Sequence, residues 1–101
     1  MLPPEIWSGL VELKPLNRPK YGAAGAFTNI VTWARDAEEF RGKADTIAAT
    51  LSMCVMQVEN VAPVGDSADW PEEFEDMVRR AEANPNAIIY GTFHNYPHDQ
   101  A

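Results

Sequence analysis

Two helix-capping signatures constrain the fold of this chain more than any other feature. The stretch 36–39 (DAEE) begins with an Asp that can accept a free backbone amide, and an acid stands three positions on. The stretch 69–72 (DWPE) repeats the pattern, with a proline placed in the first turn, where its missing amide costs nothing. The sequence therefore predicts two helices, one beginning at each signature.

Apolar spacing supports both helices. Five residues after the first signature fall on one stripe of a helix of about 15 residues: Phe40, Ala44, Ile47, Ala48 and Leu51. The second helix has its own stripe, formed by Phe74, Met77, Val78 and Ala81. Its acids come in the first turns and Arg79 and Arg80 near the end, which is the order that the helix dipole favours. Both segments are therefore expected to pack on a sheet.

Four further segments have the pattern of strands, at residues 6–13, 25–34, 53–61 and 87–93. In the second of them Phe27, Val31 and Trp33 share one parity, which indicates that one face of this strand carries the larger apolar side chains. Residues 14–24 contain two prolines and a glycine, so a long hairpin loop is expected between the first two strands. The predicted element order is ββαβαβ.

This order predicts an α+β fold: a two-layer sandwich of a four-stranded sheet with two helices on one face, ferredoxin-like or related. A chain of 101 residues supports one core, so residues 1–101 are expected to form a single domain, with residues 94–101 as a C-terminal tail. The face without helices would stay partly apolar, which favours a homodimer through that face.

Composition narrows the class of protein. No apolar run approaches the roughly 20 residues of a membrane span, and the N-terminus lacks the features of a signal peptide, so a cytoplasmic protein without a membrane partner is expected. Cys54 is the only cysteine, which excludes an internal disulfide and a thiolate zinc site. Its apolar neighbours suggest a place in the core.

Charge is unevenly distributed. Residues 1–43 carry six basic and five acidic side chains, whereas residues 44–101 carry two basic and ten acidic ones. Seven acids and no Lys or Arg lie between Glu59 and Asp76. Such a field repels phosphate backbones and attracts basic surfaces, which argues against nucleic-acid binding and for a basic protein partner.

Motifs for catalysis or cofactor binding are weak. His94, His98 and Asp99 are the only cluster with metal-ligand residue types, but Pro97 favours an extended backbone, so neither a metal nor another cofactor is predicted. The loop 14–25 combines basic residues with glycines, yet it matches no phosphate-binding pattern and leads into a strand. No serine or cysteine lies in a glycine-flanked elbow, so no catalytic residue is assigned.

Three groups of segments, 9–16, 25–31 with 36–40, and 90–97, resemble those of small uncharacterised bacterial proteins. That resemblance implies a ferredoxin-like or related sheet and brings no activity. In size, acidity and lack of catalytic motifs the chain is also similar to immunity proteins of bacterial contact-dependent inhibition systems. Those proteins neutralise a toxin domain, often a basic nuclease.

The leading hypothesis is a protein-binding domain without enzymatic activity, of the immunity type, that docks a basic toxin domain. The residues expected to contact the partner are Glu59, Asp66, Asp69, Trp70, Glu72, Glu73 and Asp76. The alternative is a small dimeric ferredoxin-like enzyme or ligand-binding protein, with a pocket lined by Tyr90, His94 and Tyr96. A structural or regulatory subunit is the third reading.

Overall fold

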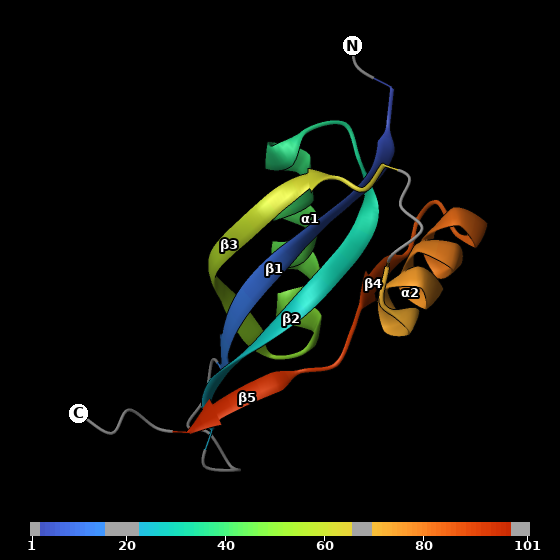
Figure 1. The fold of residues 1–101 in the computed structure, drawn as a ribbon. Helices are drawn as coiled ribbons and strands as arrows, with labels where there is room; N and C mark the ends of the chain where they lie inside the picture. The colour runs from blue at the N-terminus through green and yellow to red at the C-terminus, as the bar shows by residue number, and fades with distance from the viewer. Residues whose placement is uncertain (1–2, 16–22, 66–69, 98–101) are drawn as a thin grey trace.

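A computed structural model describes residues 3–15, 23–65 and 70–97 of the chain. It is an α+β fold in which an antiparallel sheet packs with two helices (Figure 1). The elements are β1 (Glu5–Pro15), β2 (Ala23–Ala34), α1 (Ala37–Thr50), β3 (Met53–Pro63), α2 (Glu72–Ala83), β4 (Ile88–Tyr90) and β5 (His94–Pro97). The order ββαβαβ is therefore confirmed, and β5 is an additional strand.

The sheet has the order β3-β1-β2-β4, and every neighbouring pair is antiparallel. β1 and β2 form a long hairpin in which Glu5 lies opposite Ala34 and Leu13 opposite Ala26. The short strands β4 and β5 share the outer edge of β2, at opposite ends of that strand. The ferredoxin-like strand order is not confirmed.

The first helix begins at its predicted cap. The Asp36 carboxylate accepts the amide of Glu39 at 2.8 Å, and the Glu39 carboxylate accepts the amide of Arg35 at 2.8 Å. Phe40, Ala44 and Ala48 are completely buried, as the stripe predicts. α1 therefore forms because its local signals and its packing agree.

The second helix begins differently from the prediction. Pro71 is the residue that precedes the helix, its side chain makes no capping bond, and its carbonyl accepts the amide of Glu75 at 2.9 Å. Proline was expected inside the first turn, and the Asp69 of that signature lies outside the described residues. The apolar stripe is confirmed, because Met77, Val78 and Ala81 are buried.

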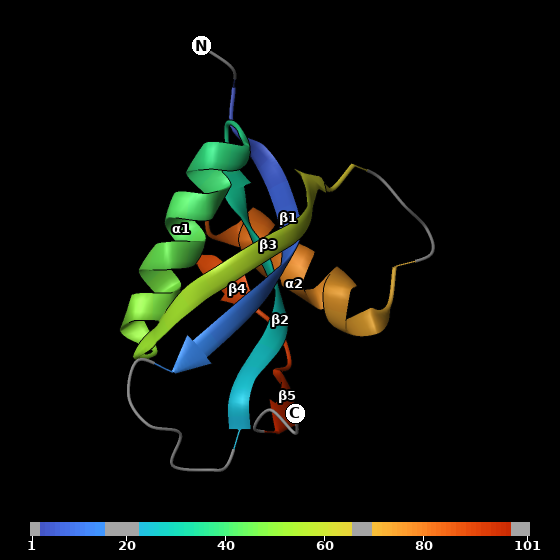
Figure 2. The ribbon, with the colours of Figure 1, turned by 90° about the vertical axis from the view of Figure 1, so that its left-hand side faces the viewer.

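The two helices lie on opposite faces of the sheet, so the predicted two-layer sandwich with both helices on one face is wrong. On β2, Ile30 belongs to the core beneath α1, whereas its neighbour Val31 belongs to the core beneath α2. Successive side chains of a strand point to opposite faces. Figure 2 shows α1 on one side of the sheet and α2 on the other, which makes three layers.

The connection from β3 through α2 to β4 explains the error. Because all neighbouring pairs are antiparallel, β3 runs parallel to β2 and antiparallel to β4. The handedness rule for crossovers applies only between parallel strands, so it constrains α1 but not α2. The packing argument for a homodimer through a helix-free face is lost with the two-layer arrangement.

The pairing of β1 with β3 is irregular and leaves room for Phe40. The register shifts between Ser8 and Leu10, and Asn60 has a positive φ of 56° opposite this irregularity. A Cβ atom added at Gly9 would lie 2.9 Å from the Phe40 ring and 3.0 Å from Val61. Gly9 is therefore the point at which the Phe40 ring reaches the β1 backbone.

Two smaller predictions also differ from the structure. Residues 94–97, expected to begin a tail, form β5, in which His94 lies opposite Phe27; residues 98–101 lie outside the described part. Cys54 is only partly buried on the edge strand β3 and is not in the core. Of the helices in the described residues, neither is long and apolar enough to cross a membrane.

Candidate functional site

Helix α2 carries three of the six acids that the sequence predicted to contact a partner: Glu72, Glu73 and Asp76. Glu72 is exposed and has no ion pair within the described residues. Asp76 pairs with Arg80, Oδ2 to Nε, at 3.0 Å, and Glu75 pairs with Arg79, Oε1 to Nη2, at 2.9 Å. Arginines of the same helix therefore neutralise part of the negative charge of α2.

Glu73 has a structural contact that the sequence did not indicate. Its carboxylate accepts the Thr92 hydroxyl at 2.7 Å and the Thr92 amide at 3.0 Å, which ties α2 to the break between β4 and β5. These hydrogen bonds, the hydroxyl first and the amide second, hold the pKa of Glu73 below its ordinary value, and His94 adds a small favourable charge. Glu73 is thus less available to a partner than predicted.

Glu59 and Trp70, the other predicted contact residues that the structure describes, do not lie in one patch. Glu59 is exposed on β3, a strand that makes no contact with α2 within the described residues. Asp66 and Asp69 lie outside the described part of the chain. Trp70, by contrast, is partly buried beside α2, where its ring meets the Phe74 ring edge to face at 5.4 Å.

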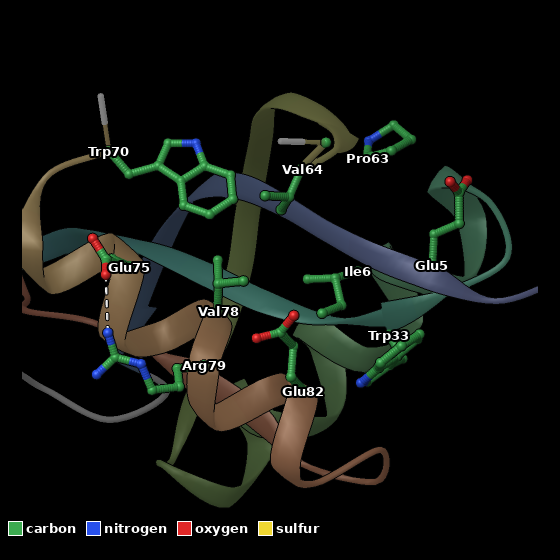
Figure 3. Close-up of a pocket in the computed structure, with 11 residues that line it drawn as sticks. Glu5, Ile6, Trp33, Pro63, Val64, Trp70, Glu75, Val78, Arg79 and Glu82 are labelled. Atoms are coloured by element: carbon green, nitrogen blue, oxygen red, sulfur yellow. Dashed lines mark hydrogen bonds and ion pairs between the residues drawn. The ribbon is translucent and has the colours of Figure 1, made fainter. Parts of the chain in front are cut away.

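A groove of about 410 Å³ lies between α2, the start of β1 and the end of β3 (Figure 3). We call it the Trp70 groove. Its lining without charge consists of Ile6, Trp33, Pro63, Val64, Gly65, Trp70 and Val78. Its charged lining consists of Glu5, Glu75, Arg79 and Glu82. The groove therefore combines an apolar floor with a rim of net negative charge.

Hydrogen bonds hold the walls of the Trp70 groove in place. The indole N–H of Trp33 donates to the Ala81 carbonyl at 2.7 Å, and Lys43 donates to the Trp33 carbonyl from the other side of the sheet. The Val64 amide donates to the Ile6 carbonyl at 2.8 Å, which ties the segment after β3 to β1. The apolar floor is thus formed before any ligand arrives.

The acids of the rim differ in their partners. Glu75 forms the ion pair with Arg79 described above, and both side chains are more than half exposed. Glu5 and Glu82 are exposed and form no ion pair among the described residues. Two carboxylates at this groove are therefore uncompensated, in addition to Glu72 on the helix.

The alternative pocket at the end of the sheet gains no support. Tyr90 is exposed on β4 and contacts the Phe93 ring at 5.4 Å, and His94 is exposed on β5. Neither borders the Trp70 groove, and the Tyr96 side chain is not among those described. Within the described residues no group of three or more His, Cys, Asp or Glu is placed to hold a metal ion.

Comparison with known proteins does not extend this picture. No protein-family model, curated protein or solved structure matches the chain. The function must therefore be argued from the groove and from α2 alone.

Sequence reasoning missed several residues of the groove. Glu75, Val78, Arg79 and Glu82 fall at positions i, i+3, i+4 and i+7 of α2, so helical periodicity could have placed them on one face. Glu5, Ile6 and Trp33 belong to strands far away in the sequence. Only the tertiary fold brings them to Trp70.

Proposed function

We propose that this protein is an immunity-type binding domain that neutralises a basic protein partner, such as a toxin nuclease domain. The observation that carries the proposal is the Trp70 groove, where half-covered aromatic rings adjoin uncompensated carboxylates. Tryptophan is over-represented among the residues that dominate binding energy at protein interfaces. Acidic groups around it accelerate and orient the approach of a basic surface.

The surface for this partner comprises the groove and the exposed side of α2. Within the described part of the chain Glu5, Glu72 and Glu82 have no ion pair, whereas Glu75 and Asp76 share their charge with arginines. Because like charges repel, the same surface disfavours phosphate-rich ligands. Binding of a basic partner is expected to weaken as ionic strength rises.

The test begins with capture of partners from the cell of origin, followed by purification of the captured protein. Calorimetry then measures its dissociation constant with the natural chain and with the double variant E72K/E82K. We expect the reversal of two exposed charges to weaken binding about 100-fold, because like charges at an interface cost several kcal/mol. If the partner is a nuclease, its activity should be inhibited by the natural chain and restored with the variant.

The matched control is E38K/D45K, which reverses two exposed acids of α1 on the opposite face of the sheet. It changes the net charge equally but leaves the Trp70 groove intact. Equal loss of affinity in the two double variants would show a nonspecific effect of charge and contradict the proposed surface. A purified partner with an acidic or neutral contact surface would contradict the proposal as a whole.

A further inference from the structure

We infer that the Trp70 groove binds one arginine side chain presented by the partner protein. This inference rests on the proposed function and assigns the chemistry of its central contact. An arginine needs an apolar channel for its methylene stem, a flat surface for its guanidinium group, and carboxylates for its N–H donors. The groove supplies all three.

The stem has a floor to lie on. Ile6 and Val64 are partly covered and Val78 is buried, and Figure 3 shows these three side chains between Trp70 and Trp33. Long charged side chains gain by laying their methylene groups along such a surface while the charged end stays in water. This part of the groove is apolar and does not select between arginine and lysine.

The head group has two kinds of partner. Glu82 lacks an ion pair among the described residues, and Figure 3 shows its carboxylate pointing toward Ile6, whereas the carboxylate of Glu5 lies on the other side of β1 from Ile6. Trp33 and Trp70 offer aromatic surface, on which a guanidinium group stacks better than an ammonium group does. Among the described residues Arg79 is the one cation lining this groove, and Glu75 already neutralises it.

The open shape of the groove favours a side chain carried by a protein. The residues along its rim, Glu5, Pro63, Glu75, Arg79 and Glu82, are all exposed. Sites for free small molecules usually bury most of the ligand surface, which this groove does not do. A side chain held by a partner needs no such enclosure, because the surrounding interface completes it.

The experiment uses three peptides of equal length: octa-arginine, octa-lysine and neutral octa-citrulline. Calorimetry at physiological ionic strength, where the Debye length is about 8 Å, measures their binding to the natural chain and to E5Q/E82Q. We expect octa-arginine to bind more tightly than octa-lysine and octa-citrulline not to bind. In E5Q/E82Q the affinity for octa-arginine should fall about tenfold, because the Glu82 carboxylate that pairs with the guanidinium group and the neighbouring charge of Glu5 are both lost.

Two further variants distinguish binding at the groove from attraction to the overall negative charge of the protein. E38Q/D45N removes the same number of charges from α1, and its affinity for octa-arginine should stay within about twofold of the natural chain, because exposed charges beyond a Debye length are screened. Trp70→Leu keeps an apolar contact with Phe74 but removes one of the two aromatic surfaces of the groove. It should reduce the preference for octa-arginine over octa-lysine.

The outcomes distinguish this inference from the proposed function. If E5Q/E82Q and E38Q/D45N bind octa-arginine equally well, the arginine site is wrong, while binding of a basic partner elsewhere on the surface stands. If Trp70→Leu weakens both cationic peptides by the same factor, the guanidinium assignment is wrong. If neither cationic peptide binds the natural chain, the proposed function itself is contradicted.

Discussion

On one face of the sheet α1 buries Phe40, Ala44 and Ala48 completely, whereas on the other face α2 leaves Trp33 and Trp70 only partly covered. The core beneath α1 draws buried residues from β1 and β2 and partly buried residues from β1 and β3. The core beneath α2 is smaller, and one side of it opens into the Trp70 groove. The two faces thus differ in how much apolar surface they enclose.

This difference assigns the two faces different tasks. Burial of apolar area is the main source of folding free energy, so the α1 face is expected to dominate stability. Incompletely covered aromatic rings with carboxylates beside them are a feature of binding surfaces. Changes on the α1 face should therefore alter stability alone, and changes around the groove should alter binding first.

The largest expected effect is that of Phe40→Ala. The Phe40 ring is completely buried between α1 and the sheet, so its removal leaves a cavity that costs about 3–5 kcal/mol of the free energy of unfolding. Urea denaturation measures this loss. Affinity for octa-arginine, measured where the variant is folded, should stay unchanged; a parallel loss of affinity would contradict the division between the faces.

Met77→Ala probes the smaller core. Met77 is almost fully buried beneath α2, but the cluster around it is small and borders an open groove, so we expect a loss of about 2 kcal/mol, at the low end for such truncations. The same urea measurement applies. A cost equal to that of Phe40→Ala would show that the two cores contribute alike.

Gly9→Ala tests the close contact on the α1 face. A methyl group at this position meets the Phe40 ring and Val61 within about 3 Å, and such crowding costs about 1–3 kcal/mol. The cost should shrink in a Phe40→Leu background, where the ring is absent. Equal costs in both backgrounds, determined by a double-mutant cycle, would place the strain in the backbone instead.

The smallest effect concerns Glu73. Because its pKa is lowered in the folded state, its ionised form stabilises the protein above the pKa of the unfolded chain, and this contribution is lost as pH falls through the lower folded pKa. Glu73→Gln should therefore be less stable than the natural chain at neutral pH, with the difference vanishing in acid. Thermal denaturation across pH measures it, and Thr92→Val should show the same trend. A difference independent of pH would contradict the charged contact.

Much of the fold was predictable because its signals are local. The cap at Asp36 and the stripes of both helices depend on residues three and four positions apart, and the structure confirms them. The placement of α2 was not predictable from the crossover rule. Yet β2 has apolar residues on both parities, a pattern typical of a strand that is covered on two faces. The structure agrees, because the adjacent residues Ile30 and Val31 are both completely buried.

The site was predictable only in its charge. Composition located the acids of α2, and spacing of four residues would have paired Glu75 with Arg79 and Asp76 with Arg80. The contact of Glu73 with Thr92 spans 19 residues and depends on the break in the edge strand. Glu5 and Glu82 line one groove although they are far apart in the sequence. Their proximity depends on the tertiary fold, and no local sequence pattern indicates it.

Mapping of the octa-arginine contact by two-dimensional NMR tests the central claim most directly. The indole signals of Trp33 and Trp70 should move on titration, together with the amides of α2 and of the first residues of β1. The indole of Trp7, whose nitrogen is buried without a hydrogen-bond partner among the described residues, should remain in place as an internal reference. Shifts concentrated on α1, or on β3 around Glu59, would contradict the assignment of binding to the α2 face.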